Sequence, residues 1–94
     1  MFETLQNRYI NGFQKKIEDF ESFIIQKDSE AIRILGHQLH GSGASYGFEK
    51  ITDIGKKINN LAKESDENKW EKLKKELFVL NTYIEDQKKT RGLT

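Results

Sequence analysis

The chain has 94 residues, carries 16 Lys and Arg against 15 Asp and Glu, and contains neither cysteine nor proline. This length gives one small domain with a single core, and a formal net charge of +1 gives no reason to expect nucleic acid or an anionic membrane as a partner. The absence of cysteine excludes disulfides and thiolate chemistry, and the absence of proline, with 35% hydrophobic and 33% charged residues, favours helices with solvated outer faces.

The apolar stretches of the chain are short. The longest, residues 23–25 and 77–80, are far too short to cross a bilayer. No charged-then-apolar leader precedes Leu5, so a secretory signal is not expected. We therefore expect the protein in the cytoplasm.

The first helix is predicted over residues 2–26. Its apolar residues recur at spacings of three, four and seven, which is typical of an amphipathic helix that buries one face. The stripe consists of Phe2, Tyr9, Phe13, Ile17, Phe20 and Ile24, with Leu5 and Phe23 at its edge. Asn11 and Gly12 have weak helix propensity, so we expect a bend there.

The second helix, residues 29–46, starts at a cap formed by Asp28 or Ser29. At about 100° of rotation per residue, one of its sides carries a stripe that we assign to the core. That stripe consists of Ala31, Ile32, Leu35, Leu39, Ser42 and Tyr46. Gly47 is predicted to follow the helix in a left-handed conformation.

The opposite side of this helix is unusual for a solvated surface. His37 lies almost opposite the core stripe, and the residues around it are Arg33, Gly36, His40, Gly41 and Ala44. Solvated helix faces normally carry Lys, Glu and Gln, and Gly36, Gly41 and Gly43 together cost roughly 2–3 kcal/mol relative to alanine inside a helix. An imidazole among missing side chains leaves room for another macromolecule, so we interpret this side as a docking face.

Two more helices are predicted, over residues 48–64 and 67–88. Their apolar stripes are Ile51, Ile54, Ile58 and Leu61 in the first, and Trp70, Leu73, Leu77, Leu80 and Ile84 in the second. Three apolar residues lie off the last stripe: Phe78, Val79 and Tyr83. Three interpretations of them stay open, namely a broad buried face, a dimer contact and isolated exposed residues. Residues 88–94 are expected to fray. Four helices joined by short turns predict an all-α, antiparallel four-helix bundle over residues 1–94.

The segment from His37 to Gly47 resembles the signature of the histidine-containing phosphotransfer (HPt) domain. In that family the phospho-accepting His is followed by an apolar residue at +2, usually Lys at +3, Gly at +4, a small residue at +5 and a Gly near +10. The matching residues of this chain are His37, Leu39, Gly41, Ser42 and Gly47. The chain departs from the pattern at +3, where His40 replaces the usual Lys.

This resemblance implies a four-helix bundle that acts as a phosphocarrier and not as a kinase. His37 would take a phosphoryl group from a sensor or hybrid histidine kinase, or from an aspartyl phosphate on a response-regulator receiver domain, and pass it to another receiver in a two-component phosphorelay. The residues of the docking and phosphate environment would be Arg33, Gly36, His40, Gly41 and Ala44. The family leaves Mg²⁺ to the acidic site of the partner, so we expect no cofactor on this chain and expect it to act as a monomer.

Other interpretations of the same residues are weaker. His37 and His40 stand three residues apart on a helix and could form a metal pair, but no Glu-x-x-His and no cysteine accompany them, so no metal site is predicted. The run Gly41-Ser42-Gly43 lacks the strand and the Gly-Lys-Ser/Thr ending of a phosphate-binding loop. Ser42 lacks the strand–turn–helix elbow of a hydrolase nucleophile, and packing on the core side explains it better. A helical adaptor bundle that binds receiver domains without phosphotransfer and a small metal-binding bundle stay open as alternatives.

Overall fold

The computed structural model describes residues 1–93, and Thr94, the last residue of the expected domain, lies outside the described residues. The described part folds into five α-helices and one 3₁₀ turn, without a strand. In chain order the elements are α1 (Phe2–Asn11), α2 (Phe13–Gln26), α3 (Ser29–Gly43), η1 (Ala44–Tyr46), α4 (Glu49–Ala62) and α5 (Lys69–Thr90).

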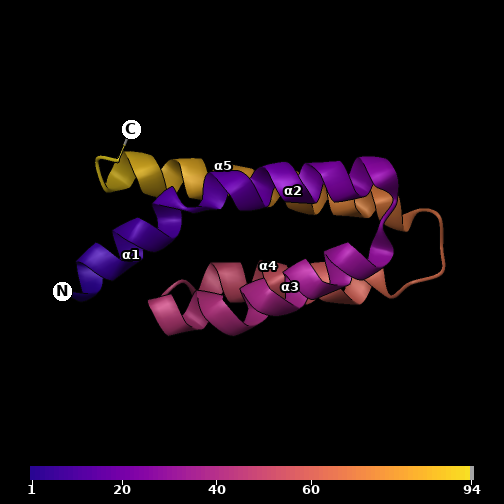
Figure 1. Ribbon diagram of the computed structural model, residues 1–94, viewed down its shortest axis with the longest axis horizontal. Coiled ribbons are helices and arrows are strands. Elements are labelled where there is room, and N and C mark those ends of the chain that lie inside the picture. The colour runs from indigo at the N-terminus through magenta and orange to yellow at the C-terminus, as the bar shows by residue number, and fades with distance from the viewer. Residues whose placement is uncertain (94) are drawn as a thin grey trace.

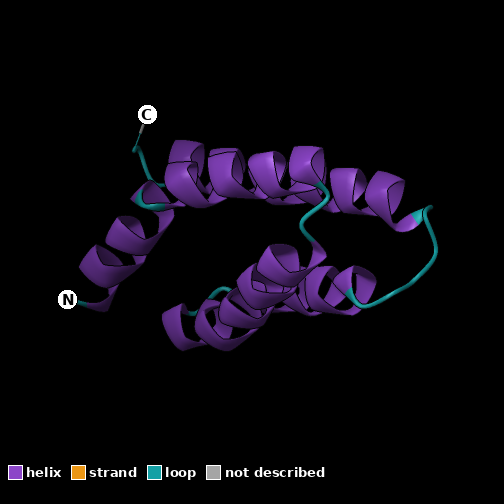
Figure 2. Ribbon diagram, turned by 45° about the vertical axis from the view of Figure 1, so that its right-hand side comes forward, coloured by secondary structure: helices purple, strands orange, loops and turns teal. Residues whose placement is uncertain are grey.

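The four long helices form two layers. In Figure 1, α2 and α5 lie side by side in one layer, and α3 and α4 lie side by side in the other. Successive long helices run in opposite directions, and α1 bends away from the axis of α2 (Figure 2). The molecule is elongated, with extents of 42 × 22 × 16 Å. The prediction of an all-α, antiparallel four-helix bundle is confirmed, with α1 and α2 together forming its first helix.

The break between α1 and α2 lies at Gly12, where a bend was expected. Ile10 and Phe13, on either side of the break, are both fully buried. The predicted stripe did not include Ile10, because it was drawn along one continuous helix. The same assumption placed Phe2 in the core with Leu5 at its edge, and this is wrong, since they are 51% and 47% exposed.

The helix ends are held by side chains as well as by turns. Asp28 Oδ1 accepts a hydrogen bond of 3.1 Å from an amide in the first turn of α3, and Gly47 follows η1 with a φ of 84°, so both predicted caps are confirmed. α4 ends at Ala62, two residues before the predicted boundary. There Lys69 Nζ donates to the carbonyl oxygens of Ala62 at 3.2 Å and Glu64 at 2.8 Å, which satisfies groups that a helix end leaves free.

One continuous apolar core joins the helices. Its largest fully buried side chains come from every long helix, and they include Phe13, Phe20, Ile32, Leu39, Ile51, Ile58, Leu73 and Leu80. Of the three residues off the α5 stripe, Val79 and Tyr83 pack against the core, whereas Phe78 is 72% exposed. The broad buried face therefore accounts for two of them and leaves Phe78 on the surface.

The C-terminal turn of α5 packs against the rest of the bundle. The Arg91 guanidinium lies 5.0 Å from the centroid of the Phe48 ring. Its Nη1 donates to Gln6 Oε1 at 3.2 Å and to Asn7 Oδ1 at 3.1 Å. The expected fraying from residue 88 is therefore wrong as far as Arg91, because this side chain ties the end of α5 to α1 and to the start of α4.

Candidate functional site

Three glycines bring α3 and α4 into close contact. A Cβ atom on Gly36 would lie 2.6 Å from the amide nitrogen of Asn59, and one on Gly43 would lie 2.5 Å from that of Thr52. On α4, a Cβ atom on Gly55 would lie 2.4 Å from a backbone nitrogen of α3. A side chain at any of these positions would force the two closely packed helices apart.

Gly36 therefore belongs to the helix contact and not to the docking face, and its predicted place there is wrong. The rotation per residue gives the direction of Gly36 from the helix axis, but not that α4 occupies this direction. Gly41 differs, because no atom lies within 4 Å of the position that its Cβ would take. The exposed surface, here called the His37 face, consists of His37, His40, Gly41 and Ala44, with the partly buried Arg33 at its edge.

Two side chains of α4 hold the α3 backbone on either side of His37. Asn59 Nδ2 donates to the carbonyl oxygen of Arg33 at 2.9 Å. Thr52 Oγ1 donates to the carbonyl oxygen of His40 at 3.0 Å and accepts a hydrogen bond of 2.7 Å from the amide four residues later. Sequence reasoning missed both α4 residues, since their only signal is the glycine opposite each of them. The α3 turn that carries His37 is thus held in place by hydrogen bonds from α4.

Arg33, the only Arg or Lys of α3, already has an anionic partner. Its Nε donates to Glu30 Oε1 at 2.9 Å, and its Nη2 binds the same oxygen. The hydrogen bond from Arg33 holds the pKa of Glu30 below its ordinary value and raises the pKa of Arg33. The charge expected beside His37 is therefore directed one turn toward the start of α3.

Ser42, the small residue of the motif, faces the N-terminal helix. Its Oγ lies 2.7 Å from Tyr9 Oη in a hydrogen bond. The Tyr9 ring stacks on Tyr46 with the ring centroids 4.3 Å apart, and burial raises the pKa of Tyr9 above its ordinary value. The prediction that Ser42 packs on the core side is confirmed.

A family model described as the Hpt domain matches residues 5–88, nearly the whole chain. The chain belongs to the Hpt domain family. Hpt domains are helical phosphocarriers of phosphorelays that interact with receiver domains and kinases in two-component systems, and they are not kinases themselves. The comparisons with curated proteins and with solved structures returned no match.

Beside the His37 face of this Hpt domain lies a hollow of about 280 Å³ between α2 and α3. Ile34 and Gln38 of α3 line it, with Phe23 and Leu35 deeper in. Ile34 is 45% exposed and sits one turn before His37, so it extends the accessible surface with an apolar patch. Sequence reasoning missed Ile34, because it belongs neither to the core stripe nor to the group of small residues.

The Hpt domain holds no cluster of three or more His, Cys, Asp or Glu side chains placed to bind a metal ion within residues 1–93. The pair of His37 and His40 therefore has no third ligand of these types in that range. None of the helices in the described part is both long enough and apolar enough to cross a membrane. The cytoplasmic location stays a prediction.

Proposed function

We propose that His37 is the phospho-accepting residue of this Hpt domain. In this proposal the domain relays a phosphoryl group between a sensor or hybrid histidine kinase, or a receiver aspartate, and a response-regulator receiver domain. The observation that carries the proposal is the exposure of His37 beside Gly41, where nothing lies within 4 Å of the missing side chain. A receiver active site can approach the imidazole there without displacing any side chain at residue 41.

The chemistry asks this chain for a positioned nucleophile and little else. An unprotonated ring nitrogen of His37 attacks the phosphorus of the partner's aspartyl phosphate, in line with the leaving carboxylate oxygen. An N–P bond forms, the P–O bond to the aspartate breaks, and the other ring nitrogen gives its proton to water. The reverse steps deliver the phosphoryl group to the next receiver. Mg²⁺ would be bound by the acidic site of the partner, and we propose no metal on this chain.

The remaining residues of the site have supporting roles in this proposal. Gly41 and Ala44 keep the surface low enough for a close approach, and the apolar patch at Ile34 extends the area that a receiver can cover. Arg33 and His40 are the basic residues within one turn of His37, and Arg33 can reach the phosphoryl oxygens only when it leaves Glu30. Because all of these residues lie in α3 or in the η1 turn that follows it, one copy of the chain has a complete site, and we propose a monomer that works in the cytoplasm.

The matched variants His37→Gln and His40→Gln test the assignment on a single helix face. Incubation with a phosphorylated receiver domain should label the wild type with a phosphoryl group that is acid-labile and alkali-stable, as a phosphoramidate is. His37→Gln should abolish the label, and His40→Gln should keep it. Both variants should retain the helical circular dichroism of the wild type, because both positions are exposed.

Full labelling of His37→Gln would contradict the assignment, and so would loss of the label in His40→Gln alone. Stable binding of the receiver domain by the wild type without any transfer would favour the adaptor alternative. These outcomes separate the choice of histidine from the choice between carrier and adaptor.

A further inference from the structure

A groove runs along the contact between α4 and α5, away from the His37 face. One hollow of about 400 Å³ and a second of about 380 Å³ share Lys57 and Glu76 in their linings and are therefore adjacent. A third hollow of about 310 Å³ shares Lys50 and Val79 with the second. From Lys50 to Leu61 the groove follows α4 for about 16 Å, which is three turns of a helix.

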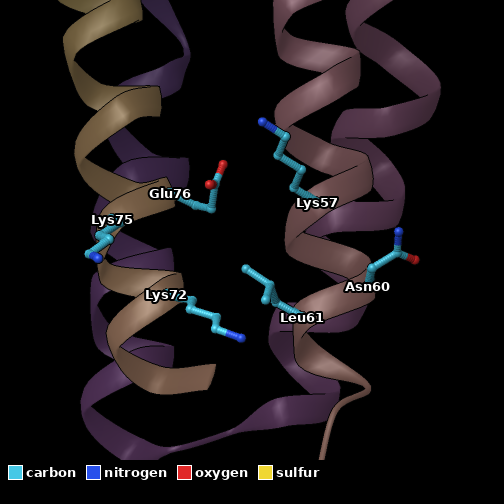
Figure 3. Close-up of a pocket in the computed structure, with 6 residues that line it drawn as sticks. All are labelled: Lys57, Asn60, Leu61, Lys72, Lys75 and Glu76. Atoms are coloured by element: carbon cyan, nitrogen blue, oxygen red, sulfur yellow. The ribbon is translucent and has the colours of Figure 1, made fainter. Parts of the chain in front are cut away.

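The floor of the groove is apolar. Along the groove, the apolar lining residues follow one another in the order Leu61, Ile54 and Val79. Phe78, which is 72% exposed, lies at the far end. In the close-up of Figure 3, Leu61 points from α4 into the space between the two helices. A solvated groove of three helical turns therefore has apolar side chains along its whole length.

The rim of the groove is basic. The three hollows are lined by five lysines and three carboxylates, a net charge of +2 in a chain whose total is +1. The lysines are Lys50, Lys56, Lys57, Lys72 and Lys75. In Figure 3, Lys57 and Lys72 extend from opposite helices toward the same space. Lys72 has one ion-pair contact, 3.8 Å to Glu64, and Lys57 has none within the described residues.

The groove and the His37 face can be occupied together. The side of α4 that carries Thr52, Gly55 and Asn59 is covered by α3, whereas Ile54, Lys57 and Leu61 lie on its other side. No residue of α3 lines the three hollows of the groove. A molecule bound in the groove would leave the imidazole of His37 accessible.

We propose that this groove binds an acidic amphipathic helix of a partner protein. An apolar floor with basic rims is complementary to a helix that has apolar residues three and four positions apart and carboxylates on both flanks. Glu76 between the lysines and the apolar floor both disfavour a polyanion such as nucleic acid, which would need continuous positive charge. The proposal is independent of phosphotransfer and adds a second contact surface to the domain.

The probe for this proposal is a capped peptide of about 14 residues, long enough to fill the groove. Its leucines recur three and four positions apart, and glutamates fill the other positions. Two control peptides have the same leucines redistributed around the helix, or lysine in place of every glutamate. In a ¹⁵N-resolved NMR titration, the first peptide should shift the amides of residues 50–61 and 72–83, and the controls should not.

A matched pair of charge reversals tests the rim. Lys57→Glu with Lys72→Glu should weaken binding of the acidic peptide at least about tenfold, since two attractive contacts become repulsive. Lys74→Glu with Lys89→Glu changes the net charge equally, breaks a comparable ion pair to Glu71, and lies outside the groove, so it should leave affinity within about twofold. His37→Gln should bind the peptide as the wild type does.

Several results would overturn the proposal. These are no saturable shifts, equal weakening by both double variants, shifts centred on the His37 face, or tighter binding of a single-stranded oligonucleotide than of the peptide. Each of them leaves the labelling experiment on His37 untouched, so failure of the groove and failure of the phosphotransfer assignment can be told apart.

Discussion

His37 has two cationic residues within one turn, and neither supplies a free, permanent charge. Arg33 is paired with Glu30, and His40 replaces the lysine usual at this place in the family. The lysine that the family usually has at this place would carry a permanent positive charge. Under the proposed assignment, the positive charge that reaches a phosphoryl group on His37 therefore depends on whether Arg33 leaves the carboxylate of Glu30.

Glu30→Gln should accelerate phosphoryl transfer to His37 from a phosphorylated receiver domain by about two- to fivefold, because it releases Arg33. Glu71→Gln breaks an equivalent pair three residues apart, with Lys74 on α5, and serves as the matched control. Single-turnover transfer rates at constant ionic strength measure the difference. Equal rates for Glu30→Gln and wild type would show that the Glu30 pair does not limit the charge at His37.

At the scale of elements, the glycines of α3 have two different roles that one pattern does not distinguish. The apolar period correctly predicts which side of α3 enters the core and that His37 is exposed. It cannot assign Gly36, because the order of the helices around the bundle decides whether α4 or solvent lies beside it. The roles of Thr52 and Asn59 could not be predicted for the same reason, since their hydrogen-bond partners are backbone atoms of another helix.

The same substitution at two glycines of α3 should have opposite effects. Gly41→Ala should raise the free energy of unfolding by up to about 1 kcal/mol, because alanine favours the helix and its Cβ meets nothing. Gly36→Ala should lower it by about 1–3 kcal/mol, because its Cβ would overlap the α4 backbone. Urea unfolding followed by circular dichroism measures both. A stabilising effect of Gly36→Ala would contradict the close α3–α4 contact.

At the scale of the whole molecule, contacts between residues distant in sequence close the bundle. The fold class, the bend at Gly12 and most of the core follow from apolar spacing, since each is a property of one helix and its neighbours in the chain. The contacts of Arg91 with Phe48 and Gln6 join segments separated by more than forty residues. No periodic pattern predicts such a contact, so the predicted fraying from residue 88 was wrong as far as Arg91.

The burial of the Tyr9 hydroxyl, which is hydrogen-bonded to Ser42, makes the stability of the bundle sensitive to alkaline pH. Burial raises the pKa of Tyr9 above its ordinary value, so the unfolded chain loses this proton at a lower pH than the folded chain. The contribution of the buried Tyr9 to the free energy of unfolding is therefore fully present below about pH 10, and it is lost as the pH rises through the pKa of Tyr9 in the folded chain.

Tyr9→Phe should lower the free energy of unfolding by about 1 kcal/mol at pH 8, because it removes the hydrogen bond to Ser42. The difference in free energy of unfolding between wild type and variant should be smaller at pH 10.5, because only the wild type has Tyr9 and loses stability as this residue ionises. Urea unfolding at both pH values measures it. Tyr83→Phe is the control, because burial also raises the pKa of Tyr83 but Tyr83 has no part in this hydrogen bond. A gap that stays constant for Tyr9→Phe would contradict the assignment.

The two anchors from α4 to the backbone of α3 have a consequence for timing. Because Thr52 and Asn59 hold the turn on both sides of His37, the surface has little conformational entropy left to lose when a partner arrives. A preorganised surface reaches a useful affinity with few contacts, and a complex with few contacts dissociates quickly. A carrier must bind one partner, react, dissociate and meet the next. Under the proposed assignment, the residence time of each partner on the His37 face therefore depends in part on Thr52 and Asn59, the two α4 side chains behind it.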